Sequence, residues 1–420
     1  MRYKAPIIDH QVGIKCYCTD FGGVGGAIKQ QTKDFYVVEI IDPSVLGKLT
    51  EHQDENHKFP LYVLEKSNID SNHAVEKIKE RYGIQLRVLG IKDAKADTLQ
   101  YATTNKLKKF KREIRTSQVS LSLKGFTSRP ISKSILLGNQ FSIVIRTNQS
   151  MDAQQFKREL KHIANFYGLQ RFGSRRAVTH LVGKEIVSRN YKRAVELLLS
   201  YTTHYDSATN KEIREKSQDP RNYPGLVRSM PKGMDIERHL MYAALDGKDD
   251  IIALRTIPIN IRRLFVQAYQ SYIFNLCLSE VLLAGQDILE GKQGDLCFEV
   301  EGPLKFGKVR RFDPTSDSEC NTVPAVSLAG YAYQAREGRF ESVTTSLLKS
   351  EGIVSKDFYI KEMQELSTRG GYRQAQLCAT NFSMDGMDPL AVSFSLPSGS
   401  YATTLLREIM KPLDPIKSGF

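Results

Sequence analysis

The sequence predicts an α+β protein of two domains. Its 420 residues exceed the length at which one hydrophobic core usually keeps growing, so two cores are expected. The N-terminal part contains several segments in which apolar and polar residues alternate as in strands, together with amphipathic helical segments. Residues from about 190 to 375 are instead mixed helix and loop. Hydrophobic residues make up 41% of the chain, which is enough to fill both cores.

The charge balance indicates a polyanionic partner. The chain has 60 Lys and Arg residues against 47 Asp and Glu residues, a formal net charge of +13. Such an excess of positive charge is typical of proteins that bind nucleic acid. Nucleic acid is therefore the expected partner.

The cysteines and the N-terminus indicate a cytoplasmic protein. There is no C-x-x-C pair and no histidine cluster that could complete a zinc site, so we expect no structural metal. The first residues lack the apolar core of a signal peptide, and no uncharged apolar run is long enough to cross a bilayer. We therefore expect no membrane attachment. The six cysteines are Cys16, Cys18, Cys277, Cys297, Cys320 and Cys378.

Residues 14–40 begin with a glycine-rich loop and end in a strand. The glycines at 22, 23, 25 and 26 lack the spacing of dinucleotide-binding and P-loop motifs, so no nucleotide cofactor is expected. Residues 35–40 are apolar on both faces, which predicts a strand inside a sheet. A second strand is predicted over residues 58–66. A helix follows over residues 71–83, which Ser71 can cap and Gly83 ends.

Residues 87–103 form the most informative stretch of the chain. Apolar residues on either side predict two short strands, and a charged turn separates them. This turn holds Lys92, Asp93, Lys95 and Asp97, so a carboxylate lies close in sequence to ammonium groups. Asp93 is a candidate catalytic acid. The alternative is a charged surface turn without function.

The next segment, residues 105–115, is strongly basic and has one acidic residue, Glu113. It could be a solvated helix face, or it could contact the phosphates of a nucleic acid. Its candidate RNA-binding residues are Lys106, Lys108, Lys109, Lys111 and Arg112.

The remaining segments continue the alternation of strands and helices. Strands are predicted over residues 116–126 and 137–146, and an amphipathic helix over 152–168, capped by Asp152 and ended by Gly168. A helix over 262–280 has aromatic residues that suit a core. Near the C-terminus, a strand over 392–396 leads into a turn and a short helix that starts at Thr403 and ends before Pro412.

A cluster of arginines follows the predicted helix at 152–168. Arginine is well suited to planar, bidentate recognition of phosphate, so these residues are candidate RNA contacts. Ion pairs within the protein are the alternative for each of them. The cluster comprises Arg171, Arg175 and Arg176.

Five segments resemble the motifs of the TruD-type pseudouridine synthases, which isomerise a uridine in tRNA. The turn around Asp93 reads G-x-K-D-x-x-A-x-T-x-Q and resembles the family signature. The other four are I-K-x-x-x-x-D-F-x-V-x-E-I at 28–40, G-N-x-F at 138–141, N-F-Y-G-L-Q-R-F-G at 165–173 and L-P-S-G-S-Y-A-T followed by R-E at 396–408. The resemblance therefore extends from end to end.

The resemblance implies a role for each matching residue. Asp93 would be the catalytic aspartate and Lys29 would approach it. Phe35 and Asn139 would lie beside the target uridine. In addition, Phe141 would form the pocket wall and Tyr401 would stack on the base. Without the resemblance, Lys29 would be interpreted as solvated, Phe141 as core and Asn139 as a turn residue.

These residues should meet in one place if the resemblance holds. We expect the substrate-contacting residues to converge on a single cleft, with the Lys29 ammonium within about 4 Å of the Asp93 carboxylate. The inserted part of the chain should face the same cleft. Whether Asp93 acts as a nucleophile or as a base stays open.

The resemblance also implies an architecture and a substrate. Residues 1–164 and 376–420 would form a discontinuous catalytic domain, built on a mixed, largely antiparallel sheet with flanking helices. Residues 165–375 would form an inserted α/β domain, the TRUD domain. The expected substrate is tRNA, at uridine 13, and the expected enzyme is a monomer without a cofactor.

Two alternatives come from other functional classes. One is a non-catalytic RNA-binding protein that retains the scaffold, although it would not need Asp93, Lys29 and Tyr401. The other is an RNA methyltransferase, which would have a glycine-rich loop after a strand. In this chain the glycine-rich loop precedes the strand.

Overall fold

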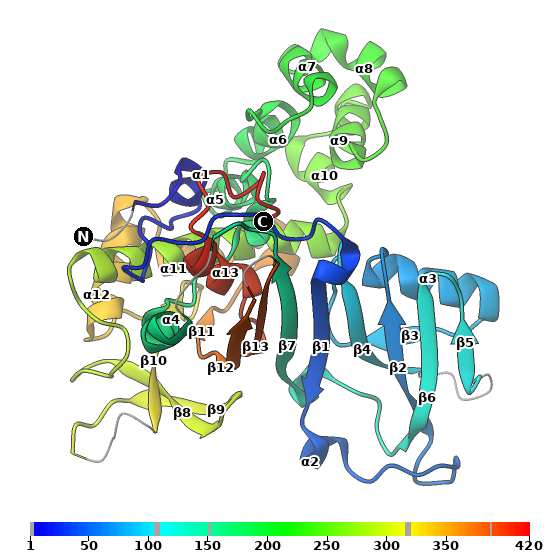
Figure 1. Cartoon of the computed structure of the whole chain (residues 1–420). Helices are drawn as coiled ribbons and strands as arrows, with labels where there is room; N and C mark the ends of the chain where they lie inside the picture. The colour runs from blue at the N-terminus through cyan, green and yellow to red at the C-terminus, as the bar shows by residue number, and fades with distance from the viewer. Residues whose placement is uncertain (1–3, 105–109, 150–152, 316–320, 387–388) are drawn as a thin grey trace.

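The computed structural model describes residues 4–104, 110–149, 153–315, 321–386 and 389–420 (Figure 1). Lys106, Lys108, Lys109 and Asp152 lie outside these ranges. The chain forms a nine-stranded sheet, a four-stranded sheet and thirteen α-helices within these ranges. The helices are α1 (Ile7–Gln11), α2 (Pro43–Leu46), α3 (Ser71–Tyr82), α4 (Ala153–Glu159), α5 (Thr179–Val187), α6 (Tyr191–Ser200), α7 (Ala208–Lys216), α8 (Tyr223–Ser229), α9 (Asp235–Leu245), α10 (Asp250–Arg255), α11 (Ile259–Leu283), α12 (Arg339–Ser350) and α13 (Ala402–Met410).

The nine-stranded sheet combines both ends of the chain, which Figure 1 shows as blue and cyan strands beside red-brown ones. Its order is β12-β13-β7-β1-β4-β2-β6-β5, and β3 pairs with β4. Its strands are β1 (Phe35–Ile41), β2 (Phe59–Lys66), β3 (Leu86–Val88), β4 (Asp97–Thr104), β5 (Glu113–Arg115), β6 (Val119–Thr127), β7 (Leu136–Ile145), β12 (Thr380–Asp385) and β13 (Leu390–Pro397).

The register of this sheet lines up the site residues. β1 is parallel to β4 and antiparallel to β7, so Val37 lies between Thr98 and Phe141. All other strand pairs are antiparallel. The predicted α+β fold with a mixed, largely antiparallel sheet and flanking helices is therefore confirmed, as is the position of β1 inside the sheet.

The four-stranded sheet has the order β11-β10-β8-β9 and comes from the later part of the chain. Its antiparallel strands are β8 (Leu296–Gly302), β9 (Lys305–Arg311), β10 (Thr322–Leu328) and β11 (Gly371–Gln374). Ala164 bridges Gln376, and the Asn165 N–H donates to the Ala375 carbonyl. The two passages of the chain between the sheets therefore run side by side.

The predicted helix over 152–168 was too long. α4 ends at Glu159, and after a single 3₁₀ turn over Leu160–His162 the chain becomes extended. Ile163, Ala164, Asn165 and Phe166 are all at most 1% exposed. Four consecutive buried residues suit an extended segment that is covered on both sides, rather than a helix with one solvent face.

The helical interpretation of the basic segment is also wrong for residues 113–115, which form β5.

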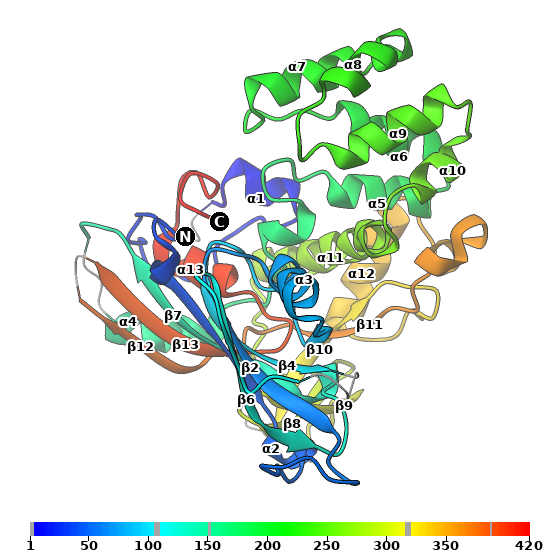
Figure 2. The ribbon, with the colours of Figure 1, turned by 90° about the vertical axis from the view of Figure 1, so that its right-hand side faces the viewer.

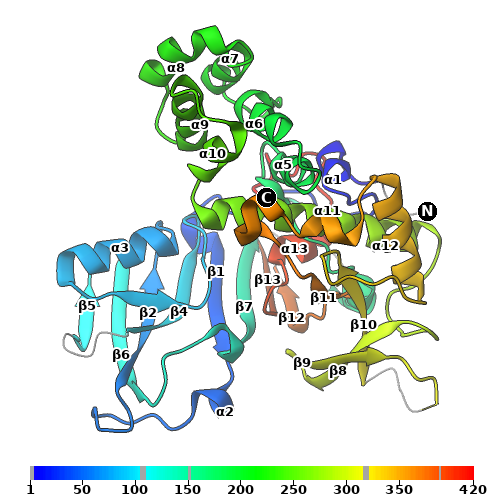
Figure 3. The same ribbon diagram turned by 180° about the vertical axis from the view of Figure 1, so that it is seen from behind.

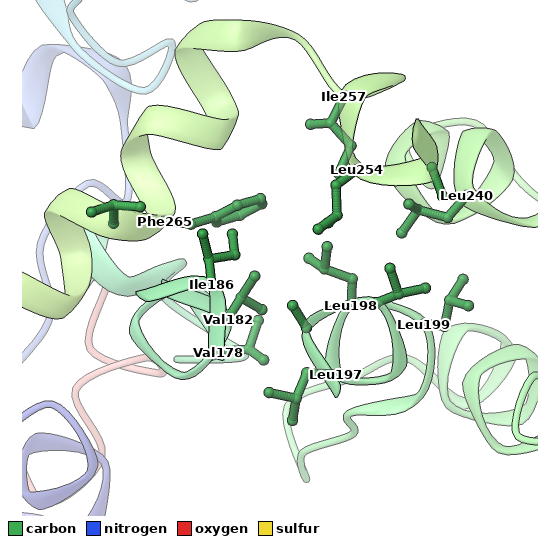
Figure 4. Close-up of a cluster of buried hydrophobic side chains, with 14 of the residues drawn as sticks. Val178, Val182, Ile186, Leu197, Leu198, Leu199, Leu240, Leu254, Ile257 and Phe265 are labelled. Carbon is green, nitrogen blue, oxygen red and sulfur yellow. The ribbon is translucent and has the colours of Figure 1, made fainter. Parts of the chain in front are cut away.

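Helices α6–α10 stand apart from both sheets, as Figures 1 and 2 show. They pack with α5 and α11 around aliphatic side chains (Figure 4). Val182 and Ile186 of α5 meet Leu198 of α6 and Phe265 of α11 in this core. Among the helices that the structure describes, none is long and apolar enough to cross a membrane.

Candidate active site

Asp93 lies in the turn between β3 and β4, and its carboxylate meets the ammonium group of Lys29. The Nζ atom of Lys29 is 3.5 Å from Oδ2 of Asp93. The Lys29 side chain is 9% exposed, whereas that of Asp93 is 58% exposed. A largely buried cation therefore faces a carboxylate that a large substrate can reach.

The backbone and an aromatic ring hold Lys29 in place. Lys29 has a φ of 56°, an uncommon value for a residue other than glycine. Its Nζ lies 4.8 Å from the centroid of the Phe35 ring, within range of a cation–π interaction. Burial lowers the pKa of Lys29, and the Asp93 charge opposes that shift. The ammonium group is thus held between a ring and a carboxylate.

A pocket of about 170 Å³ opens beside Asp93. It contains every substrate-contacting residue predicted from the sequence, so Phe35, Asn139, Phe141 and Tyr401 converge as expected. Lys29 contacts the pocket through Asp93 and Phe35. The lining residues are Phe35, Val37, Ile91, Lys92, Asp93, Ala96, Thr98, Asn139, Phe141, Gln170, Ser400, Tyr401, Ala402 and Thr403.

Aromatic rings form the walls of this pocket. Phe35 and Phe141 are each 7% exposed, and their rings meet edge to face at 6.3 Å. Tyr401 immediately precedes α13, and its ring lies 5.9 Å from that of Tyr167. A Cβ atom at Gly168 would come within 2.7 Å of Thr403 Oγ1 and 3.5 Å of Tyr401 Cδ1. Glycine at 168 therefore lets the link between the two sheets pass close behind Tyr401.

A polar network holds Asn139 at the pocket. Lys92 Nζ donates to Asn139 Oδ1 at 2.7 Å and lies 3.2 Å from Oε1 of the buried Glu39. The other carboxylate oxygen of Glu39 accepts the Tyr101 N–H at 2.9 Å. The Asn139 carbonyl oxygen is thus occupied, whereas its amide nitrogen has no partner among the residues that the structure describes.

Gln170 is a site residue that the sequence did not single out. Its Nε2 donates to Asp93 Oδ2 at 3.2 Å. The residue lies in the 3₁₀ helix Leu169–Phe172, just after the extended link between the sheets. The only signal for it in the sequence was its place in the N-F-Y-G-L-Q-R-F-G segment.

Lys66 was also missed, and it fixes the backbone of the Asp93 turn. Its buried Nζ donates to the carbonyls of Ile69 and Asp93, each at 2.8 Å. Burial lowers the pKa of Lys66 to about 8. The available signal in the sequence was a lysine at the end of an apolar strand. A lysine there is buried only if partners bind its ammonium group.

Ser71 and Gln100 hold the other side of the turn. Ser71 was predicted to cap α3, but Asp70 is the cap, accepting from the N–H groups of Asn72 and His73. The Ser71 hydroxyl instead donates to Gln100 Oε1 at 2.7 Å and accepts the Lys92 N–H at 2.9 Å. Gln100 in turn donates to the Gly90 carbonyl at 2.6 Å.

The three arginines of the predicted RNA-binding cluster have different environments. Arg175 is exposed. Arg171 is half-buried and donates to Ser271 Oγ at 3.1 Å. Arg176 is ion-paired with Glu237 at 3.2 Å and donates to three backbone carbonyls. Its placement favours the alternative interpretation, an ion pair within the protein.

Lys111 and Arg112 are exposed and lie next to β5, at the edge of the large sheet. β2 and β6 separate β5 from β4, so neither residue lines the pocket at Asp93. Figure 1 shows β5 at the end of the sheet that is far from α13. Any contact of these two residues with a nucleic acid therefore lies away from the pocket at Asp93.

Metal ligands were not expected from the sequence. The structure contains no cluster of three or more His, Cys, Asp or Glu residues suited to a metal ion within its described ranges.

Comparisons with known proteins agree with this geometry. The sequence model of tRNA pseudouridine synthase D (TruD) matches residues 11–409. A probable tRNA pseudouridine synthase D from Archaeoglobus fulgidus is 31% identical, over 96% of this chain and 99% of that protein. One from Pyrobaculum islandicum is also 31% identical, over 99% of this chain and all of that protein.

A solved structure extends the likeness to the fold. The crystal structure of the TruD protein from Methanosarcina mazei superposes with a TM-score of 0.80 at 27% identity, covering 99% of this chain and all of the other. The match runs through both sheets and through every segment that resembled a family motif. The chain therefore belongs to the tRNA pseudouridine synthase D (TruD) family.

Proposed function

We propose that this protein is a tRNA pseudouridine synthase that isomerises uridine 13 of tRNA, with Asp93 as the catalytic carboxylate. The observation that carries the proposal is the contact between Lys29 and Asp93 at the edge of an aromatic pocket. A non-catalytic RNA-binding protein would not need a buried ammonium group directed at an exposed carboxylate.

The reaction determines what the site must supply. The N1–C1′ bond of the uridine breaks, the uracil turns, and a C5–C1′ bond forms; C5 loses its proton and N1 gains one. Lys29 and Gln170 both contact Oδ2 of Asp93. Within the described residues, Oδ1 has no hydrogen-bond partner, so we assign Oδ1 as the reacting atom. This holds whether Asp93 attacks the nucleoside or removes a proton from it.

The pocket suits one extruded base. Its volume of about 170 Å³ lies below the range typical of sites for drug-sized ligands, about 300–1,000 Å³. We propose that Tyr401 stacks on the target uracil, while Phe35 and Phe141 form the wall of the pocket. The amide nitrogen of Asn139 would then donate to a uracil carbonyl oxygen.

Two residues that line the pocket carry unpaired hydroxyl groups. Thr98 and Thr403 line it, and the buried Oγ1 atom of each lacks a hydrogen-bond partner in the part of the chain that the structure describes. Unpaired buried hydroxyls are costly, so a ligand that pairs with them is favoured. Uracil has carbonyl and N–H groups along its edge that suit this role.

We propose that the chain forms the two domains that the family resemblance implies. Residues 1–164 and 376–420 would form the catalytic domain, because they supply all strands of the large sheet. Residues 165–375 would form the inserted domain, which supplies Gln170 to the site. We propose a monomer that acts on tRNA in the cytoplasm. Arg171, Arg175, Lys111 and Arg112 remain proposed RNA contacts outside the pocket.

The direct test is incubation of the purified protein with tRNA that carries labelled uridine, without added cofactor. We expect pseudouridine at position 13 and at no other position. Isomerisation elsewhere would contradict the assigned position only. Tight binding of tRNA without any isomerisation would contradict the enzyme and support the non-catalytic alternative.

A further inference from the structure

A second hollow, of about 550 Å³, lies in the inserted part of the chain and outside the Asp93 pocket. It is formed where β10 ends, where β11 begins, and by the loop that follows β10. None of the residues around it is acidic, and two are arginines. The lining residues are Ser327, Leu328, Ala332, Tyr333, Gln334, Arg336, Arg369, Gly370, Gly371 and Tyr372.

Gln270 of α11 holds the chain on both sides of this hollow. The buried Nε2 of Gln270 donates to the Ala329 carbonyl and to Thr368 Oγ1. It thereby joins the two loops that surround the hollow. The backbone joins them again, because the Tyr331 N–H donates to the Thr368 carbonyl at 2.9 Å. These contacts hold the two loops together. They also give the buried Gln270 side chain a structural role.

Two unpaired guanidinium groups face solvent at this hollow. Arg336 and Arg369 are exposed, and neither side chain makes an ion pair or hydrogen bond within the described ranges. Two like charges at one hollow, neither of them paired with a carboxylate within the described ranges, are stabilised by an anion with several acceptor oxygens, such as a phosphodiester. Tyr372 is 42% exposed and offers a ring on which a base can stack.

The hollow is connected to the Asp93 pocket by a line of aromatic and basic residues. Tyr372 also lines an intervening hollow, together with Tyr167 and Arg373. Tyr167 contacts the Tyr401 ring, and Arg373 Nη1 donates to the Gly399 carbonyl at 2.8 Å. Figure 3 shows β11 next to the segment that leads into α13. Tyr167 and Arg373 are buried, so packed side chains connect the hollow to the Asp93 pocket.

We propose that the hollow at Arg336, Arg369 and Tyr372 is a second RNA-binding site, which takes a phosphodiester and an adjacent base of the tRNA away from the target uridine. The proposal rests on the proposed function only in taking tRNA as the ligand. A free mononucleotide carries the same phosphate and base, so the test must separate the two sources.

The test compares the double variant Arg336→Gln/Arg369→Gln with the wild type in tRNA-binding titrations at several salt concentrations. Each lost phosphate contact lowers the slope of log K against log salt by about 0.7–0.9, so we expect a decrease of about 1.5. Affinity near physiological salt should fall about tenfold, while the turnover number at saturating tRNA stays within about twofold. The matched control is Lys157→Gln/Arg158→Gln on α4, which removes two exposed charges that line neither pocket.

Two results would overturn the proposal. One is a salt slope that changes no more than in the control. The other is tight binding of uridine monophosphate at this hollow, abolished by the double variant, with tRNA affinity unchanged; that result would assign the hollow to a free nucleotide. Because both readouts are binding measurements, they decide the proposal even if the wild type forms no pseudouridine.

Discussion

The Nζ atom of Lys29 lies 3.5 Å from Oδ2 of Asp93, although 64 positions separate the two residues in the chain. The loop before β1 carries the lysine, and the turn before β4 carries the aspartate. Because β1 and β4 are adjacent parallel strands, the segments that precede them lie at the same edge of the sheet. The parallel pair in an otherwise antiparallel sheet therefore brings Lys29 and Asp93 together.

Removing the ammonium group should impair chemistry more than binding. In Lys29→Met, Asp93 loses its cationic neighbour, and we expect the turnover number to fall about 10²- to 10³-fold. The affinity for tRNA should stay within about threefold, since one charge among many phosphate contacts is lost. Single-turnover rates and tRNA titrations measure both. Lys33→Met, which changes an exposed lysine nearby, is the control; equal rates in the two variants would contradict the pairing.

Gln170 should act as a positioning residue through its bond to Asp93 Oδ2. We expect Gln170→Ala to lower the turnover number about 10- to 100-fold with little change in KM, because the carboxylate loses one of two groups that orient it. Gln170→Glu should lower the turnover number further, since it places a second carboxylate beside Asp93. Steady-state kinetics on both variants test this order. A glutamate variant as active as the wild type would show that the contact does not matter.

The lowered pKa of Lys66 predicts how the free energy of unfolding changes at alkaline pH. Burial lowers its pKa to about 8, from 10.5. Between these values the unfolded chain holds a proton that the folded chain has released, so the free energy of unfolding rises with pH, by up to about 1.4 kcal/mol per unit. The same free energy in Lys66→Met should rise less over this range. Denaturant unfolding of both proteins at several pH values measures the difference, and parallel curves would contradict it.

Arg175 and Arg176 should have different roles. We expect Arg175 to contribute to tRNA binding and Arg176 to folding stability. Arg175→Ala should weaken tRNA binding and lower the salt slope by about one unit. Arg176→Ala should instead cost about 3 kcal/mol of folding stability, because Glu237 loses one partner and three carbonyls lose their donor. Thermal unfolding and tRNA titrations of both variants test this. A stable Arg176→Ala protein with weakened binding would reverse the assignment.

Much of the fold and of the site was predictable from local patterns. β1 and the two strands around Asp93 appeared as apolar alternation, and α13 ended before Pro412 as expected. The site residues Lys29, Phe35, Asn139 and Tyr401 came from the family resemblance, since nothing local brings them together.

What the sequence could not show depends on partners that are distant in the chain. Ser71 looked like a helix cap because serine often is one, but its hydroxyl is bound to Gln100 and Asp70 takes the cap. The helix predicted through Gly168 ends earlier because residues 163–166 are buried on both sides and have no solvent face. Gln170 meets Asp93 only because the 3₁₀ helix Leu169–Phe172 packs beside the large sheet, and local sequence periodicity does not predict that packing.

The variant Asp93→Asn tests whether the Asp93 carboxylate performs the chemistry. The measurement is pseudouridine formation on labelled tRNA together with the tRNA affinity of the same preparation. We predict no detectable turnover, with an affinity within about threefold of the wild type, because the change removes one reacting oxygen and leaves the phosphate contacts intact. Turnover near the wild-type rate would contradict the account.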